Sequence, residues 1–365
     1  GWYYETFDDF GKFLDEQHRR FPTRPLFISE YGANADRRVH SLKPKRFDST
    51  MEWQRMYHES YLRQINDRRF VSGSAVWNNF DFSSEFRGET IPHINQKGLF
   101  TYDRKPKDIS YLYKASFVSS PVLHIAVRDW PVRSGASEQR VDIYTNLDEV
   151  ELFHDGAPVG KKSVGPSRKA SWDIKLRPGV NSLAARGSRG GQLVSDLAEI
   201  TWRDPARMTD IAVNAGSNAE YIHETGELWQ ADRVYAPGGW GYVGGGSKAS
   251  ENLRNIFGTE QDAVAQTARE GTFYGYRFDV PDGEYELELW FTELRNAKPN
   301  ERVFDVSING RKLINILDLA KEAGPFTLLS RKFRLTATDG TGITVDLQPV
   351  IGQPIISGLR VRRIF

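Results

Sequence analysis

The stretch Leu26-Phe27-Ile28-Ser29-Glu30-Tyr31-Gly32 decides the fold of the first part of the chain, because an apolar run ends there in a carboxylate. A short apolar run of this kind is typical of a buried strand of a parallel sheet. Before it, residues 7–20 carry apolar side chains at helical spacing, and Pro22 and Pro25 end that pattern. The sequence therefore predicts a helix followed by a strand whose C-terminal end presents Glu30.

Helical and strand patterns continue to alternate as far as residue 118. Residues 51–65 and 108–115 have helical spacing, and residues 71–82 have the pattern of a strand and the loop beyond it. This alternation predicts βα units, and hence the last strands and helices of a (β/α)8 TIM barrel over residues 1–118. The carboxyl ends of the strands form the catalytic face of such a barrel. We therefore expect Glu30 and Trp77, which ends the next strand, to lie at one face.

After Pro121 the pattern changes to short strands separated by turn residues. Residues 121–203 predict a small β-sandwich of immunoglobulin type, and Asp204-Pro205-Ala206 a linker. Residues 207–365 predict a second, larger β-sandwich. The Gly-rich segment 238–246 interrupts it and has the composition of a flexible loop, without the Lys-Ser/Thr of a phosphate loop. The predicted fold is thus a partial barrel followed by two β-sandwich domains.

Composition excludes several classes of function. With 49 Lys and Arg against 48 Asp and Glu, the net charge is +1, so there is no basic excess for nucleic acid. Without cysteine there is no disulfide, thiolate metal site or cysteine nucleophile. No apolar run is long enough to predict a membrane span. The histidines lack metal-ligand spacing, so we expect neither a metal nor a cofactor. The 9 Trp, 15 Tyr and 21 Phe suit the stacking of rings on sugars.

Within residues 1–118, four blocks together resemble glycoside hydrolase family 2, which contains β-galactosidases and β-glucuronidases. The blocks are Gly1-Trp2-Tyr3, Ile28-Ser29-Glu30-Tyr31-Gly32, Val76-Trp77-Asn78 and residues 95–105. The resemblance implies that Glu30 is the catalytic nucleophile at the end of barrel strand seven, with Tyr3 close to it at the end of strand six. It also implies that Trp77 forms the floor of sugar subsite −1, and that Asn95 and Lys97 reach substrate hydroxyls or a carboxylate.

The resemblance further implies a retaining exo-β-glycosidase, which needs two carboxyl groups about 5–5.5 Å apart. The acid/base of the family stands on an Asn-Glu pair, and no such pair occurs before residue 118. We therefore expect a C-terminal fragment that has no hydrolase activity by itself and needs the missing N-terminal half of the enzyme. The expected substrate is an oligo- or polysaccharide with a terminal β-linked sugar. Related modular enzymes imply a periplasmic or secreted bacterial location.

The identity of the sugar stays open at this point. Lys97 in the Asn-x-Lys pair favours a glucuronidase, because an ammonium group can bind a carboxylate. Glucuronidases of the family also place an Arg shortly before the Asn, and residues 90–94 contain none. The loop over residues 83–94 looks more like β-galactosidases, although the His that follows the nucleophile in the best known of them is Ala33 here. We favour a β-galactosidase, with a β-glucuronidase as the alternative. A non-catalytic glycan-binding or structural module is the alternative of another class.

The region from residue 210 onward resembles the malectin family of carbohydrate-binding β-sandwiches. The matching stretches include Val213-Asn214-Ala215-Gly216, Gln266-Thr267, residues 302–310 and residues 355–359. Most positions that hold the sugar in that family differ here, among them Ala265, Glu270, Arg295, Asn296 and Gly352. Trp240, Tyr242 and Tyr274 are candidates for another glycan-binding platform, which requires exposed rings. A scaffold role is the alternative for this domain.

Overall fold

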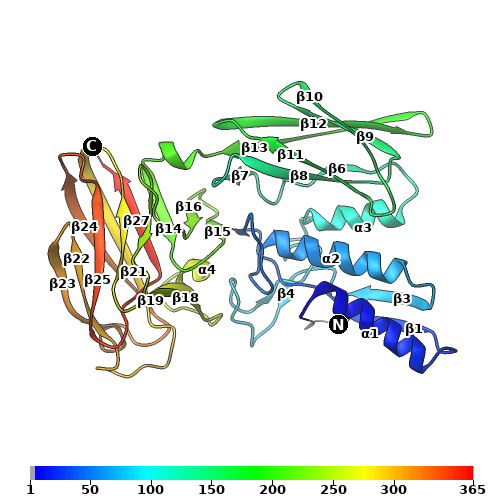
Figure 1. Ribbon diagram of the computed structural model, residues 1–365. Coiled ribbons are helices and arrows are strands. Elements are labelled where there is room, and N and C mark those ends of the chain that lie inside the picture. The colour runs from blue at the N-terminus through cyan, green and yellow to red at the C-terminus, as the bar shows by residue number, and fades with distance from the viewer. Residues whose placement is uncertain (1–4, 365) are drawn as a thin grey trace. The chain divides into compact units, whose positions relative to one another are not determined.

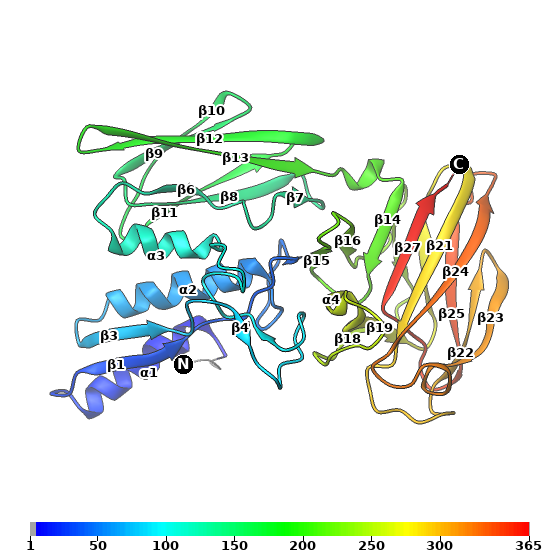
Figure 2. The same ribbon diagram turned by 180° about the vertical axis from the view of Figure 1, so that it is seen from behind.

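The structure, a computed structural model, describes residues 5–364 and divides into two compact units. Unit 1 contains the described residues up to Ser84 together with Asn95–Arg203. Unit 2 contains Glu85–Ile94 and the residues from Asp204 onward. Figures 1 and 2 show the elements of each unit from opposite sides. Among the described residues, no helix is both long and apolar enough to span a bilayer.

Unit 1 begins with two parallel strands and the helices packed on them (Figure 1). Strand β1 (Leu26–Tyr31) pairs in parallel with β3 (Val71–Val76), as the alternating pattern predicts. Helix α1 (Phe7–Arg20) has the predicted bounds, and α2 (Met51–Asn66) extends one residue beyond them. Thr50 begins α2, because its side chain accepts a hydrogen bond from the backbone N–H of Trp53. The other elements before residue 120 are β2 (Val39–His40), β4 (Phe82–Ser83), β5 (Ile94–Asn95) and α3 (Ile109–Phe117).

The helices cover only one face of this small sheet. Phe10 of α1 stacks on Tyr61 of α2 with ring centroids 4.1 Å apart, and Ile28 of β1 belongs to the same core. On the opposite face Phe27 is 64% exposed. Within the described residues β1 is thus buried on one face only, because α1 and α2 cover alternate side chains. The described residues supply two strands of a parallel sheet, so the partial barrel stays a prediction.

The rest of unit 1 is a β-sandwich. One sheet has the strand order β10-β9-β12-β13-β7 and the other β11-β8-β6. Alternating side chains, such as Val141 and Ile143 of β8 with Trp172 of β11, form the core between them. Leu112 of α3 and Tyr144 of β8 share a further core, which joins the sandwich to the helices (Figure 2). The strands are β6 (Leu123–Ile125), β7 (Val132–Arg133), β8 (Glu138–Thr145), β9 (Glu149–His154), β10 (Ala157–Ser163), β11 (Lys169–Lys175), β12 (Gly179–Arg189) and β13 (Gln192–Trp202).

Unit 2 contains the larger β-sandwich. One sheet has the strand order β15-β16-β14-β27-β21-β24 and the facing sheet β17-β20-β25-β22-β23, with β18-β19-β26 beside them. The Gly-rich segment 238–246 is not simply a loop, because β17 within it pairs with β20. Gly241 has φ 154°, and a Cβ atom there would lie 2.5 Å from the backbone nitrogen of Tyr235, so this close approach requires glycine.

The first elements of this sandwich are η1 (Pro205–Arg207), β14 (Asp210–Asn214), β15 (Glu220–Ile222), β16 (Leu228–Ala231), β17 (Trp240–Val243), β18 (Ser247–Glu251), α4 (Asp262–Ala265), β19 (Thr267–Gly271) and β20 (Tyr274–Phe278). They are followed by β21 (Gly283–Thr292), β22 (Val303–Ile308), β23 (Arg311–Asp318), α5 (Leu319–Glu322), β24 (Leu328–Ala337), β25 (Ile343–Ile351), β26 (Ile355–Ile356) and β27 (Gly358–Arg363). The two large sheets enclose a single apolar core, to which Phe278, Leu289 and Leu347 contribute.

Candidate functional site

The candidate nucleophile and the candidate subsite tryptophan leave the sheet at the same end. In the parallel register of β1 and β3, Tyr31 lies opposite Val76, and the N–H of Trp77 donates to the carbonyl of Tyr31 at 2.8 Å. Glu30 directly precedes this pair and is exposed, and Trp77 is 36% exposed. A carboxylate and an indole face are thus available to a ligand at these strand ends.

A second segment is hydrogen-bonded to the chain directly after Trp77. The N–H of Asn78 donates to the carbonyl of Lys97 at 3.1 Å, and the N–H of Leu99 donates to the carbonyl of Asn78 at 3.0 Å. Asn95 is 4% exposed, and its side-chain oxygen accepts from the N–H of Lys97 at 3.2 Å. The structure therefore brings the Asn-x-Lys pair beside Trp77, with Asn95 buried in its own turn and Lys97 half-buried.

A buried ion pair holds these loops together; the sequence indicates Asp81 as a loop cap or ion-pair partner but does not single out its lysine. The ammonium group of Lys107, 0% exposed, donates to a carboxylate oxygen of Asp81 at 3.0 Å and to the carbonyls of Ala35 and Gln96 at 3.1 and 3.0 Å. The same Asp81 oxygen accepts from the N–H of Gly98 at 2.8 Å. Burial lowers the pKa of Lys107 and raises that of Asp81, while each charge opposes the shift of the other. Nothing in the local sequence distinguishes buried Lys107 from Lys105, which is exposed.

Helix α2 adds a further tie through Gln54, which is fully buried. Its side-chain nitrogen donates to the carbonyls of Ala33 and Gly98 at 3.0 and 3.1 Å. Strand ends and loops of the candidate site are thus connected by buried polar side chains, which order them before any ligand binds. Tyr3, the remaining candidate of this site, lies outside the described residues.

The candidate glycan platform of unit 2 is not supported by the structure. Trp240 is 2% and Tyr274 is 5% exposed, because both rings point into the sandwich core. Tyr242 is half-buried, and the guanidinium carbon of Arg269 lies 3.3 Å from its ring centroid. Buried rings have no free face for a sugar, so the expectation for Trp240 and Tyr274 is corrected, and Tyr242 alone does not make a platform.

Three of the five positions that depart from the malectin pattern line a common cavity of about 380 Å³, together with Arg302 and Gln353. They are Arg295, Asn296 and Gly352. Both arginines of the cavity are paired, since Arg295 donates to Glu270 at 2.6 Å, and buried Arg302 donates to Glu293 at 2.6 Å. This cavity is polar and offers no aromatic platform.

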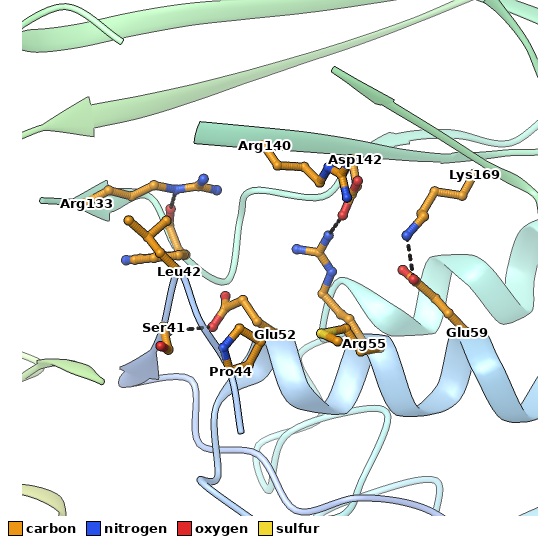
Figure 3. Close-up of a pocket in the computed structure, with 12 residues that line it drawn as sticks. Ser41, Leu42, Pro44, Glu52, Arg55, Glu59, Arg133, Arg140, Asp142 and Lys169 are labelled. Carbon is orange, nitrogen blue, oxygen red and sulfur yellow. Dashed lines mark hydrogen bonds and ion pairs between the residues drawn. The ribbon is translucent and has the colours of Figure 1, made fainter. Parts of the chain in front are cut away.

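Unit 1 has a cavity of about 210 Å³ between α2 and the sandwich strands β8 and β11 (Figure 3). Oppositely charged side chains face each other across it: Arg55 pairs with Asp142, and Glu59 pairs with Lys169 (Figure 3). The hydroxyl of Tyr144 also donates to Glu59, at 2.6 Å. Because these charged side chains pair with one another, they attach the helix to the sandwich, and we do not interpret the cavity as a ligand site.

Comparisons with known proteins agree with the sequence resemblance. The model of a malectin domain matches residues 209–359, and that of a domain of unknown function (DUF4982) matches residues 137–195. A β-glucuronidase of Bacteroides fragilis is 37% identical over 50% of this chain and 27% of its own length. A β-galactosidase of Bacteroides ovatus is 29% identical over 52% of this chain and 25% of its own length.

Among solved structures, one is Bacteroides uniformis β-glucuronidase 2 covalently bound to cyclophellitol-6-carboxylate aziridine. It is 37% identical with a TM-score of 0.91, over 100% of this chain and 44% of its own. The chain thus spans less than half of the length of each of these relatives. By these matches the chain is similar to β-glucuronidases and β-galactosidases of glycoside hydrolase family 2, and residues 209–359 match the malectin domain.

Proposed function

We propose that this chain is the part of a retaining exo-β-glycosidase that carries the nucleophile, Glu30, and that the enzyme hydrolyses β-glucuronides. The observation that carries the proposal is that Glu30 and Trp77 lie at the same end of neighbouring strands. All of this chain aligns with part of a β-glucuronidase, at 37% identity. The covalent complex of that relative is what a nucleophile at this place would form with an aziridine.

In the proposed mechanism the carboxylate of Glu30 attacks the anomeric carbon, and a second carboxyl group protonates the leaving oxygen. We place that second group in the part of the relatives that this chain does not span. Trp77 supplies an apolar surface for the sugar ring. β1 and β3 are then the last two strands of a (β/α)8 barrel, whose catalytic face is the face on which these residues lie.

The choice of glucuronide over galactoside reverses the preference drawn from the loop before Asn95. Two facts support it: the glucuronidase relative is 37% identical and the galactosidase relative 29%. The structure adds that Lys97 is held beside Trp77 through the backbone of Asn78. The ammonium group that this lysine carries would suit the carboxylate of a glucuronide, because charge-assisted hydrogen bonds are roughly twice as strong as neutral ones.

The test uses the longest natural polypeptide that contains this chain, with nitrophenyl β-glucuronide and β-galactoside as substrates. We expect Glu30→Gln to lower kcat on the order of 10³-fold or more, because it removes the nucleophile. Lys97→Met should lower kcat/KM for the glucuronide about 10²-fold, because the substrate carboxylate loses its cation. Lys105→Met, at an exposed lysine paired with Asp103, is the matched control.

The two parts of the proposal can fail separately. Full activity of Glu30→Gln would refute the assignment of the nucleophile. A parent enzyme that hydrolyses the galactoside and not the glucuronide would refute the assignment of the substrate and restore the β-galactosidase alternative.

A further inference from the structure

The segment that precedes the Asn-x-Lys pair in the sequence is part of unit 2. Glu85–Ile94 clusters with unit 2, although Ser84 before it and Asn95 after it belong to unit 1. The segment ends one peptide bond before Asn95, the first residue of the Asn-x-Lys pair. The contacts that hold Glu85–Ile94 therefore act on the start of that pair through the covalent chain.

The side chain of Gln266 holds this segment by its backbone. Its amide nitrogen donates to the carbonyls of Gly88 and Glu89 at 2.8 and 3.1 Å, and to the carbonyl of Arg254 at 2.8 Å. Gln266 is 0% exposed, so water does not replace these bonds easily. Because the acceptors are main-chain atoms, the contact fixes the path of the segment.

The fit around Gly88 is close. A Cβ atom at this position would lie 2.9 Å from the carbonyl oxygen of Leu253 and 3.3 Å from the backbone nitrogen of Asn255. Backbone thus packs directly on backbone here, and only glycine allows it without a shift.

Gln266 is itself firmly placed at the end of α4. Its N–H donates to the carbonyl of Asp262 at 2.8 Å, and its carbonyl accepts from the N–H of Asn252 at 2.9 Å. An amide group anchored at both backbone atoms can impose its position on a docked segment.

The docked segment has a folded form of its own. The N–H of His93 donates to the carbonyl of Arg87 at 2.7 Å, and a ring nitrogen of His93 is 2.7 Å from the carbonyl of Glu85. Arg87 also pairs with Glu89 at 2.5 Å. Because of these internal bonds, we expect the whole segment to move together when its hydrogen bonds to Gln266 are lost.

We propose that Gln266 is a positioning residue for glycoside hydrolysis. It does not touch the substrate; it keeps Glu85–Ile94 docked and thereby keeps Asn95 and Lys97 in place to receive the sugar. The proposal rests on the proposed function for its effect on catalysis. It gives the malectin domain a part in the hydrolase reaction that requires no glycan binding of its own.

The experiment compares Gln266→Met, which keeps the volume and loses all three hydrogen bonds, with Thr267→Val. Thr267 is the matched control, because its hydroxyl donates to Asn214 at 2.8 Å within the same domain and makes no hydrogen bond to Glu85–Ile94. Amide hydrogen exchange of the chain itself is measured over residues 85–97. KM and kcat are measured with nitrophenyl β-glucuronide in the longest natural polypeptide.

We expect Gln266→Met to speed exchange over residues 85–97 and to raise KM about threefold to tenfold, with kcat changed less than about twofold. Thr267→Val should change neither. Gly88→Ala should reproduce the effects of Gln266→Met, because it displaces the same segment from Leu253.

Unchanged exchange over residues 85–97 in Gln266→Met would overturn the proposal. So would faster exchange with an unchanged KM, because the anchor would then have no effect on substrate binding. A parent polypeptide that hydrolyses no glycoside refutes the proposed function, and it refutes the positioning role with it; the exchange data then decide only whether Gln266 anchors the segment.

Discussion

Lys107→Met is the sharpest test of what orders the candidate site. Methionine keeps the length of the side chain and removes the ammonium group, which has no exposed surface. Three buried acceptors then lose the ammonium group as a donor: the carbonyls of Ala35 and Gln96 and one carboxylate oxygen of Asp81. The carbonyl of Gln96 keeps the N–H of Ala35 and the Asp81 oxygen keeps the N–H of Gly98, so the carbonyl of Ala35 is the acceptor left unsatisfied. An unsatisfied acceptor costs about 1 kcal/mol or more, and breaking a buried pair costs about 3–5 kcal/mol. We expect unit 1 to lose stability within that range at pH 7.

The loss should depend on pH in a defined direction. The cation of Lys107 opposes the rise that burial causes in the pKa of Asp81, so its removal raises that pKa further above the usual 3.8. The folded variant then holds a proton that the unfolded chain releases above about pH 4. The destabilisation is therefore greatest near neutral pH and shrinks as the pH falls toward 4.

Native-state hydrogen exchange of amides in α2 (Met51–Asn66) measures this loss, because it reports on unit 1 without requiring the whole chain to unfold in one transition. Lys105→Met, at a side chain 68% exposed, is the control and should change stability by less than about 0.5 kcal/mol. A loss below about 1 kcal/mol for Lys107→Met, or a loss independent of pH, would refute the reasoning.

Two further predictions concern the same unit. Gly98→Ala should lower the free energy of unfolding of unit 1 by more than about 2 kcal/mol in the same exchange assay, because the new Cβ atom would lie 2.3 Å from the backbone nitrogen of Asp81. An unchanged stability would contradict this and show that the loop moves to accommodate the methyl group. Burial lowers the pKa of His58 from 6.5 to about 3. As the pH falls, His58 is therefore protonated near pH 6.5 in the unfolded chain but only near pH 3 in the folded chain. Stability should fall across this window, by about 2 kcal/mol at pH 5, and His58→Phe should remove this part of the slope.

The elements of unit 1 were predictable because their signals are local. The apolar spacing of residues 7–20 predicted α1 with its observed bounds, and the apolar run ending at Glu30 predicted β1 and its parallel pairing with β3. The exposure of Phe27 was not predictable, because it depends on which layers cover the sheet. The preference for a galactoside rested on the residues of one loop, and the comparisons support a glucuronide better.

Burial and long-range partners explain the other differences. Trp240 has the sequence context of a loop aromatic, yet β20 and the opposite sheet enclose it. Lys107 looks like any solvated lysine until Asp81, distant in the sequence, is placed against it. Gln266 belongs to a motif of the malectin family, and nothing local predicts that it binds the backbone at Gly88.

By itself, the sequence determined the helices, the strands, the order of the segments and the position of Glu30 at a strand end, because side-chain periodicity acts over a few residues. Only the tertiary structure decided which aromatic rings are buried, which charges are paired and which segment docks on Gln266. These properties depend on atoms that are far apart in the chain, and their free energy exists only once water has been excluded between them.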